Sequence, residues 1–382
     1  MARINLHKPL LHQLRLTYLL AVPALLALGA ILVLARHGDV NTTLLYSQCH
    51  ARSRLPSLSR IPVIGAPACF LVSFFIFASS SMRAVAQLSA ILSFIAALLT
   101  VSLVEAARPC NKRSWVIRHP TLSWLVMNLL GGTLVWDLWI VPEYLRRAKQ
   151  VVVERAKQDA QQTFGAGEEG GGLDPEERVR IERSFITSAD VYAIPAAVLI
   201  GFVVPSIIML TLKDVASVLV WLFFPVWVAI VRWAVEFVAV RLLRDNGPLY
   251  LESSAPSIAL VYAAPFLVSL ITHALFIFNL FCKNDSREMT RMALKFIEID
   301  FAFIAATVLY WVFIEAGSVP AVLLVVSSVF LGPGAALCIT WSVREKVICA
   351  SILDEGENTI FGEDVGDDDD DSTVHEDTPL LS

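Results

Sequence analysis

The segment MALKFIEIDFAFIAATVLYWVFI, residues 292–314, decides the fold class, because it has the length and apolar character of a membrane-spanning helix. It nevertheless carries two carboxyl groups, Glu298 and Asp300, in its first half. A charged side chain facing lipid costs at least about 2.5 to 3.5 kcal/mol, so an acid in such a segment usually faces a protein-lined cavity. We therefore predict that this segment contributes to the functional site.

The helical faces of this segment differ in character. At about 100° per residue, Asp300 shares a face with Phe303, Thr307 and Trp311. Glu298 lies about 200° further round, on a face of small residues suited to close helix packing. Asp300 is therefore expected to look onto an aromatic wall.

The whole chain has the composition of a polytopic membrane protein, since 56% of its residues are hydrophobic and only 17% are charged. An average soluble domain has about 25% charged residues. Nine apolar stretches follow one another, at residues 16–35, 61–81, 85–104, 121–141, 185–212, 215–233, 257–281, 292–314 and 319–341. We predict an all-α, multi-pass helical bundle with about eight to nine transmembrane helices, and tight helical hairpins at residues 80–83 and 213–214.

The charges divide the chain into two parts. Residues 1–343 carry a net charge of +6, and residues 344–382 carry −11. The acidic part is too polar to bury a core, so we predict a transmembrane domain over 1–343 and a disordered tail over 344–382. The basic residues lie next to the apolar stretches, where lipid phosphates are their usual partners, and they form no stripe suited to nucleic acid.

The side of the membrane on which each loop lies is left open by the sequence. The basic loop 143–184 is expected in the cytosol, and so is the tail, whose ending Glu376–Leu381 fits an acidic dileucine sorting pattern. Nine spans, however, would put this loop and the tail on opposite sides. Two glycosylation sequons, at Asn41 and Asn284, would share one side. We expect an uncleaved signal anchor at residues 16–35 and residence in the endoplasmic reticulum or another endomembrane.

The fourth apolar stretch contains several polar groups. On a regular helix Asn128 and Trp136 lie within about 80° of each other, whereas Asp137 lies opposite Asn128. A Gly131-Gly132 step could bend the helix and change that relationship. One interpretation is a span with tryptophan anchors and Asp137 at the headgroup level. The other places Asp137 at the mouth of a cavity, as a proton donor or its supporting group.

Two further polar residues fall inside apolar stretches: Asp190 near the start of the fifth and His273 in the middle of the seventh. An intramembrane histidine is typical of an interhelical hydrogen bond as well as of proton transfer. The six cysteines show no paired spacing, which indicates neither a disulfide framework nor a zinc site.

The patterns HP-x3-W-x3-N-x2-GG-x2-VWDLW-x2-P-x-YL-x-R over residues 119–147 and FIEIDFAFIAATVLYW over 296–311 resemble the fungal membrane-bound terpene cyclases of the ascofuranone and macrophorin type. The resemblance implies an enzyme that protonates an epoxide or alkene of a prenyl chain, without a metal and without releasing diphosphate. Asp300 falls at the acid of an F-x-x-x-D run, and Asp137 in the Trp-Asp pair. Ala305-Ala306-Thr307 departs from the Gly-Ser step of that pattern.

The chemistry of these residues fits the resemblance. A carboxyl group in an apolar cavity favours its protonated form and can act as a general acid, for which Asp300 and Asp137 are the first candidates and Glu298 and Asp190 the next. Aromatic faces stabilise cations. The predicted substrate-binding residues are Asn128, Trp136, His273, Phe303, Thr307, Tyr310 and Trp311. The expected partners are a lipid-like prenylated substrate and membrane lipids, with no metal and no other cofactor.

Two alternatives come from other classes. Asn284-Asp285 loosely resembles half of an intramembrane prenyltransferase site, but a second aspartate-rich loop is missing from the apolar body. A proton-coupled transporter, or a non-catalytic membrane protein of a biosynthetic pathway, would use Asp190, His273, Glu298 and Asp300 as a relay. The absence of a clear internal repeat argues against the transporter.

Overall fold

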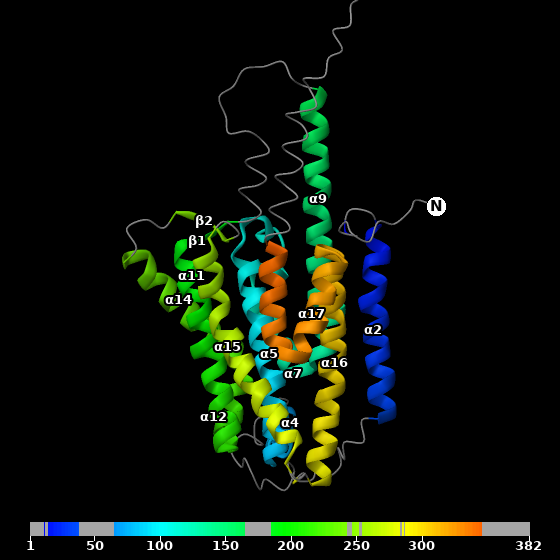
Figure 1. Cartoon of the computed structure of the whole chain (residues 1–382), viewed down its shortest axis with the longest axis vertical. Coiled ribbons are helices and arrows are strands. Elements are labelled where there is room, and N and C mark those ends of the chain that lie inside the picture. Colours follow the sequence, from blue (N-terminus) through cyan, green and yellow to red (C-terminus); the bar gives the residue numbers. More distant parts are fainter. Residues whose placement is uncertain are drawn as a thin grey trace, which may run out of the picture.

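The computed structural model describes residues 11, 14–37, 65–164, 185–242, 247–251, 254–282, 285 and 287–345. Nearly all of them are helical (Figure 1). The elements in chain order are α2 (Leu16–His37), α4 (Gly65–Ala78), α5 (Met82–Ala107), η2 (Pro109–Asn111), α6 (Trp115–Arg118), α7 (Pro120–Leu130), α8 (Gly132–Val135), η3 (Trp136–Ile140), α9 (Val141–Phe164), β1 (Phe185–Thr187), α11 (Ser188–Val198), η4 (Leu199–Val203), α12 (Val204–Leu212), α13 (Val215–Leu222), α14 (Phe224–Leu242), β2 (Pro248–Tyr250), α15 (Ala255–Leu280), α16 (Glu288–Ala316) and α17 (Ser318–Leu331). A final helical segment covers 333–345.

The number of membrane-spanning helices is smaller than predicted. Within the described residues, five helices are long and apolar enough to cross a membrane: α2, α5, the continuous α11–η4–α12, α15 and α16. The pair α13 and α14, bent by 61°, raises the number to six if it is one span. The prediction of eight to nine is not supported, because within the described residues three of the apolar stretches form short helices, of 14 residues in α4, 11 in α7 and 14 in α17. A bilayer core needs about 20.

Two of these short helices belong to hairpins that turn inside the bundle. α7 ends at Gly131, which has a φ of 120°, and α17 ends at Gly332, which has a φ of 91°. Only glycine adopts such backbone angles at low cost. A Cβ added at Gly132 would touch the Asp300 carboxyl group near the middle of α16, and one at Gly332 would lie 2.7 Å from the Cβ of His273. Both turns therefore lie deep in the bundle.

Because the two hairpins turn back inside the bundle, the segments that follow them return to the end of the bundle from which α7 and α17 enter. α7 and α17 enter from the upper end of Figure 1, and the chain returns to that end through α8–η3–α9 and through 333–345. α9 and residues 333–345 therefore point toward the same side. The turn between α12 and α13 and the start of α16 lie at the opposite end. The predicted conflict between loop and tail came from counting the hairpin of α17 as one span, because this hairpin lies between the loop and the tail in the chain.

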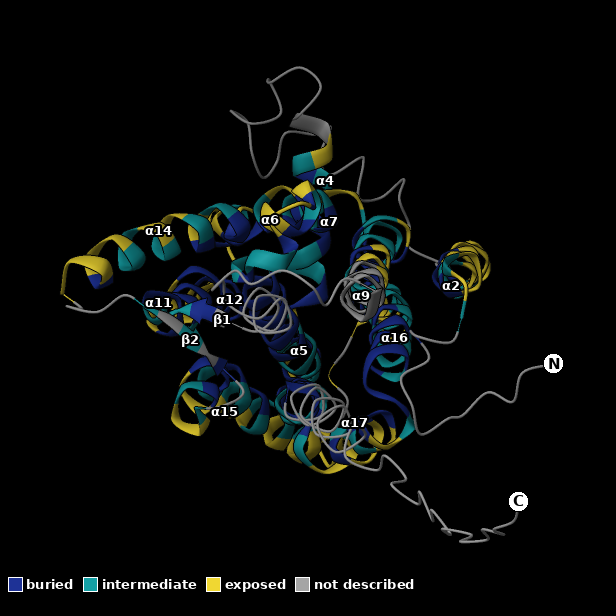
Figure 2. Ribbon diagram, turned by 90° about the horizontal axis from the view of Figure 1, so that it is seen from above, coloured by how far each residue is buried: buried dark blue, intermediate teal, exposed yellow. Residues whose placement is uncertain are grey.

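α5 lies at the centre of the bundle and α2 at its edge. In the view from above, α5 is mostly dark blue and α2 largely yellow (Figure 2). The most apolar windows of the two helices are 72% and 22% buried, respectively. Four residues of this central helix, Leu88, Ile91, Leu92 and Ile95, line the cavity that contains Asp300.

Asp285, in the connection between α15 and α16, binds the start of α5. Its carboxylate accepts the backbone N–H of Met82, the first residue of α5, at 2.9 Å, and that of Arg83 at 3.5 Å. The Met82 hydrogen bond is the main reason why the pKa of Asp285 lies below its usual value. The Asp214 carboxylate caps α13 in the same way, by accepting the backbone N–H of Ser217. The preceding residue, Lys213, has the left-handed backbone conformation. This turn confirms the hairpin predicted at 213–214.

A buried ion cluster ties the last described helix to the bundle. Arg344 contacts Glu315, and it also lies 3.0 Å from both Glu105 and Glu345. Arg108 lies 2.5 Å from Glu345. All five side chains are buried. The cluster contains three carboxyl groups and two guanidinium groups, so with every group ionised it would carry one excess negative charge.

Some predictions concern residues beyond the described part of the chain. These are the sequons at Asn41 and Asn284, the glycine-rich part of the loop at 165–184, and the tail from 346 to 382. Cys69, at the start of α4, is disulfide-bonded, which the cysteine spacing did not indicate. One disulfide leaves no repeated cysteine spacing in a sequence.

Candidate active site

A cavity of about 450 Å³ lies among α4, α5, α7, α16 and the break between α13 and α14. Its lining is mostly aliphatic and aromatic, and its polar side chains include Asn128 and the carboxyl group of Asp300. The aromatic residues of the lining are Phe70, Phe74, Phe75, Trp124, Trp221, Phe224, Phe296 and Phe301. Asp300 is the one acidic side chain in the described lining. The cavity therefore brings together an acid, an amide and many aromatic rings.

Asp300 is held by the start of a long helix. The Thr133 backbone N–H donates to Asp300 Oδ1 at 2.9 Å, and the Thr133 hydroxyl donates to the Asp300 main-chain carbonyl at 2.7 Å. Thr133 lies in the first turn of the continuous helix formed by α8, η3 and α9. Such a helix start has unpaired N–H groups and a partial positive charge, both of which stabilise a carboxylate.

Two glycines allow this approach. Gly131 provides the backbone turn that ends α7. Gly132 lets the helix start come against Asp300, because a Cβ there would collide with the carboxyl group and lie 2.9 Å from Ile304. The sequence showed the Gly-Gly step as a possible bend, and the structure makes it a complete break with a reversal of direction.

Asp137 lies behind the cavity, outside its lining. Its Oδ1 accepts the Thr307 hydroxyl at 2.6 Å, and its Oδ2 is buried without a hydrogen-bond partner among the described residues. Asp137 lies about one helical turn after Thr133, the residue whose N–H binds Asp300. The structure therefore brings together Asp300, Asp137 and Thr307, but only Asp300 reaches the cavity.

A π-helical turn, η3, carries Asp137 and Trp136. π-turns are rare and are often found at functional sites. Trp136 is fully buried between Trp124 and Trp311, with ring centroids at 5.9 and 6.3 Å. Its indole N–H also lacks a partner among the described residues. Trp136 therefore backs the cavity wall through Trp124 and does not line it.

The remaining candidate acids make contacts outside the cavity. Glu298 accepts a hydrogen bond from Gln87 of α5. Asp190 pairs with Arg232 at 2.9 Å and accepts the Thr187 hydroxyl at 2.8 Å at the start of α11. Both arrangements join helices to one another.

The predicted binding residues His273, Phe303, Tyr310 and Trp311 also lie outside the cavity lining. The His273 ring lies 3.1 Å from the Val329 carbonyl, an interhelical hydrogen bond between α15 and α17. Phe303 packs against Gly29 of α2, and the Tyr310 hydroxyl donates to the Leu19 carbonyl at 2.9 Å. Trp311 stacks on Tyr144 at 4.7 Å. Helical periodicity placed two of these, Phe303 and Trp311, on the same face as Asp300, but it did not predict the neighbouring helix that each one meets.

The aromatic lining of the cavity was missed by the sequence analysis. It comes from the phenylalanine-rich α4, from Trp124, and from the cluster around the break at Phe223. In the sequence the aromatic residues of 221–233 are typical of helix packing or of a membrane anchor. The signal that distinguishes it is the break itself: α13 ends after 8 residues.

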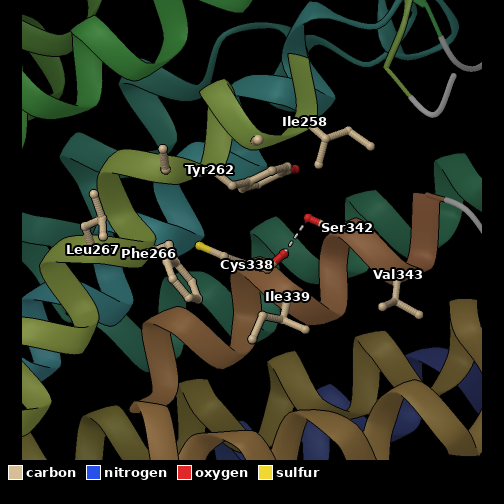
Figure 3. A pocket seen from close by; sticks show the side chains of 10 residues that line it. Ile258, Tyr262, Phe266, Leu267, Cys338, Ile339, Ser342 and Val343 are labelled. Atoms are coloured by element: carbon tan, nitrogen blue, oxygen red, sulfur yellow. Dashed lines mark hydrogen bonds between the residues drawn. The ribbon is translucent and has the colours of Figure 1, made fainter. Parts of the chain in front are cut away.

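A second cavity of about 450 Å³ lies between α15 and residues 333–345 (Figure 3). Its ten lining residues include Tyr262, Phe266, Cys338 and Ser342, and no carboxyl group. The Ser342 hydroxyl donates to the Cys338 carbonyl at 2.8 Å, the dashed line in Figure 3. Without an acid or another reactive group in reach, this cavity is the weaker candidate for a site of chemistry.

The described residues contain no group of three or more His, Cys, Asp or Glu side chains that could hold a metal ion.

One comparison with known proteins gives a match. The family model described as the CtvD domain matches residues 17–279, which is more than half of the chain. The matched region includes the broken helix with Asn128, Thr133 and Asp137, and it ends before α16 with Asp300. No curated protein and no solved structure gives a significant match.

Proposed function

The chain belongs to the CtvD-domain family of fungal, meroterpenoid-cyclase-like proteins, and from this premise we propose that it is a membrane-bound terpene cyclase. The proposed reaction is proton-initiated and metal-independent, and its substrate is a prenyl chain that carries a terminal alkene or epoxide. The observation that carries this proposal is Asp300, the one acid in the described lining of an otherwise largely apolar and aromatic cavity.

The size of the cavity supports a farnesyl-type chain. At about 30 Å³ for each water-sized heavy atom, a volume of about 450 Å³ holds on the order of 15 such atoms. A farnesyl chain contains 15 carbons, and its apolar surface matches the lining. A substrate dissolved in the bilayer would be concentrated next to the cavity, which explains the use of a membrane fold.

Asp300 is proposed as the general acid. Its carboxyl proton adds to the terminal alkene carbon, or to the epoxide oxygen with cleavage of one C–O bond, and leaves a carbocation on the chain. The Thr133 N–H at 2.9 Å stabilises the carboxylate that forms, and it is already in place before the proton moves. General acid catalysis of this kind contributes about 10²- to 10⁴-fold to a rate.

The cation then reacts within the chain. The electron pair of the next double bond forms the new C–C bond and moves the positive charge along the chain. Loss of a proton from a neighbouring carbon ends the sequence, so the product is an isomer of the substrate and one proton is returned. The faces of Trp124, Trp221 and Phe224 stabilise the intermediate cations, and the absence of bulk water delays their capture.

Asp137 is proposed to support the acid without touching the substrate. Two neighbouring carboxyl groups in an apolar environment resist losing both protons, so one remains available for transfer. Thr307 donates to Asp137 at 2.6 Å and fixes its orientation. This division of roles makes Asp300 the proton donor and Asp137 a positioning residue.

The proposal is tested by expressing the chain in a host without related pathways. Its microsomes are incubated in EDTA with a farnesylated epoxide and with the matching unoxidised compound, and the products are analysed by mass. We expect a cyclic isomer from the parent and a loss of about 10²- to 10⁴-fold with Asp300→Asn. The matched control is Glu298→Gln on the same helix, whose side chain faces Gln87 and should retain the activity.

Two outcomes would overturn the proposal. Equal activity of the parent and Asp300→Asn would remove Asp300 from the reaction. No product from either substrate, with both proteins folded in the membrane, would favour the transporter, and proton-coupled flux in vesicles would then be measured.

A further inference from the structure

The second cavity, between α15 and residues 333–345, lies at the outer face of the bundle (Figure 3). α15 is at the edge of the bundle in Figure 2, and 22% of its most apolar window is buried. On the α15 wall of the cavity Leu267 is 54% exposed, whereas Ile258 and Tyr262 are buried. Lipid surrounds such a face in a membrane, so a molecule that occupies this cavity comes from the bilayer.

The two walls of the second cavity meet at one end and separate toward the other. A Cβ added at Gly332 would lie 2.7 Å from the Cβ of His273, and one at Gly334 would lie 2.9 Å from a serine hydroxyl of the same helix, α15. Further toward the upper end of Figure 1, the cavity lies between residues 258–267 and residues 338–343. The glycines thus bring the two helices together below the cavity, and their separation above it leaves the space open.

One buried hydroxyl group in the second cavity has no partner. The Tyr262 side chain is 3% exposed, and its hydroxyl makes no hydrogen bond to any described residue. A buried tyrosine hydroxyl usually has a partner. In Figure 3 this hydroxyl points into the space between the two helices, toward the wall that carries Ser342. The Ser342 hydroxyl donates to the Cys338 carbonyl at 2.8 Å, and its oxygen can still accept a hydrogen bond from a ligand.

The charge of the second cavity restricts the head group of a ligand. The ten described residues that line it include no Lys, Arg, His, Asp or Glu. A phosphate, carboxylate or ammonium group placed among them would be buried without a counter-charge in the lining, which is strongly unfavourable. A neutral hydroxyl group, in contrast, can donate to or accept from Tyr262. The cavity therefore fits a neutral lipid that has a small polar group.

The shape of the second cavity fits a molecule broader than one acyl chain. Its α15 wall, residues 258–267, advances about 13 Å along the helix. A volume of about 450 Å³ holds on the order of 15 heavy atoms, whereas a single extended chain advances about 1.2 Å per atom and would place about 11 over this length. Ala259 and Ala263, one turn apart, leave room for a broad apolar face, and the rings of Tyr262 and Phe266 can pack on it.

We propose that the second cavity is a binding site for a membrane sterol. A sterol is neutral, its fused rings form a broad and rigid apolar body, and it carries one hydroxyl group, which would form hydrogen bonds with Tyr262 and Ser342. Its rigidity reduces the conformational entropy that is lost on binding. This site lies on a different part of the bundle from the cavity that contains Asp300, and it does not rest on the proposed function.

The test measures sterol binding to the full chain in nanodiscs of phosphatidylcholine. A sterol and the same ring compound without its hydroxyl group are compared, each relative to empty nanodiscs. We expect the chain to prefer the sterol to the deoxy compound by about threefold to tenfold, which corresponds to the usual net contribution of a hydrogen bond.

A variant then locates the preference. Tyr262→Phe keeps the ring and removes the hydroxyl group, so it should lose most of the preference for the sterol. Its folding without sterol should be unaffected, because the hydroxyl makes no hydrogen bond to the described residues. The matched control is Tyr192→Phe, at an exposed tyrosine of α11, which should keep the preference. A preference that is absent from the parent, or unchanged in Tyr262→Phe, would overturn the proposal.

A measurement on the unmodified chain identifies the class of lipid. A sterol with a diazirine on its rings should crosslink within residues 258–267 or 338–343, and excess unlabelled sterol should compete with it. Crosslinks confined to other segments, or equal competition by a diacylglycerol, would overturn the assignment to a sterol. Binding is measured without turnover, so the two proposals fail separately. Loss of the sterol site would leave the cyclase proposal intact, and absence of cyclisation would leave the sterol site intact.

Discussion

The backbone N–H of Thr133 lies 2.9 Å from Asp300 Oδ1, and the Thr133 hydroxyl lies 2.7 Å from the Asp300 main-chain carbonyl. One residue thus fixes both the side chain and the backbone of the candidate acid. The N–H contact favours the carboxylate, and the apolar cavity favours the protonated acid. A group under these two opposing influences can give up a proton and later regain it.

Gly132→Ala should impair activity through the position of Asp300. The new Cβ would collide with the carboxyl group and lie 2.9 Å from Ile304, so the acid must move. We expect activity to fall at least about tenfold with the fold retained, as measured by product formation and by thermal unfolding in detergent.

The comparison for that variant is Gly131→Ala. A Cβ at Gly131 meets nothing within 4 Å, but its φ of 120° is strained for alanine. The expected effect is a loss of stability of about 1–2 kcal/mol. The steric explanation predicts that Gly132→Ala loses more activity than Gly131→Ala for the same loss of stability. An equal ratio of activity loss to stability loss in the two variants would contradict it.

Asp137→Asn should lower activity less than Asp300→Asn. An asparagine oxygen can still accept the Thr307 hydroxyl, so the local structure is preserved while the second titrating carboxyl group is lost. We expect a decrease of about tenfold in kcat with little change in KM, measured by initial rates over a range of substrate concentrations. If Asp137→Asn abolished turnover and Asp300→Asn did not, the two roles would be exchanged.

Removal of a cation from the buried ion cluster should lower the free energy of unfolding much more than removal of an anion. Arg344→Met leaves three buried carboxyl groups with only Arg108, and we expect a loss of about 3–5 kcal/mol in the free energy of unfolding. Glu105→Gln removes the excess negative charge and keeps an acceptor for Asn111, so it should be close to neutral. Urea titration in mixed micelles distinguishes the two. Equal destabilisation would mean that charge balance does not govern the cluster.

Asp285 should make the stability depend on pH at the acidic end. Its pKa is lowered in the folded protein by the Met82 N–H, so its contribution is fully present above the unfolded-state value of about 3.9 and is lost as the pH falls through the folded value. The difference in melting temperature between the parent and Asp285→Asn should be constant above pH 5 and shrink below about pH 4. A difference that persists at the lowest pH would contradict the capping role.

The deep hairpins predict the sidedness of the protein. A tag inserted between residues 164 and 185 and a tag placed after residue 345 should both be cleaved, or both be protected, when protease is added to sealed microsomes. A tag inserted at Asp285 should behave oppositely. Opposite accessibility of the first two tags would restore an odd number of crossings between them.

The sequence predicted the class of the fold and the importance of residues 292–314, because composition and the cost of a buried acid are local properties. It also predicted that Asp300 and Asn128 matter, and both line the cavity. It did not predict the length of α7 or α17, since an apolar stretch looks the same whether it crosses the membrane or turns back at a glycine.

The sequence also did not predict which neighbouring helix each helix face contacts. Phe303 and Asp300 are three residues apart, yet Phe303 meets α2 and Asp300 meets the start of α8. Periodicity gives the angle between two side chains but not the helix that each one faces. The aromatic lining from α4 and from Trp221 depends on such tertiary contacts, and one sequence does not contain them.

The π-helical turn η3 determines in which direction around the helix axis the residues of α8 point, relative to α9. It contains one residue more per turn than an α-helix, and it lies between the anchored α9 and the start of α8. Deleting one residue within η3 would restore an ordinary helix and rotate Gly132 and Thr133 by about 100° around its axis. The hydrogen bond from the Thr133 N–H to Asp300 would then be lost. A deletion or insertion in this short turn would therefore abolish the contact between α8 and Asp300, whereas single substitutions there would weaken it by smaller amounts.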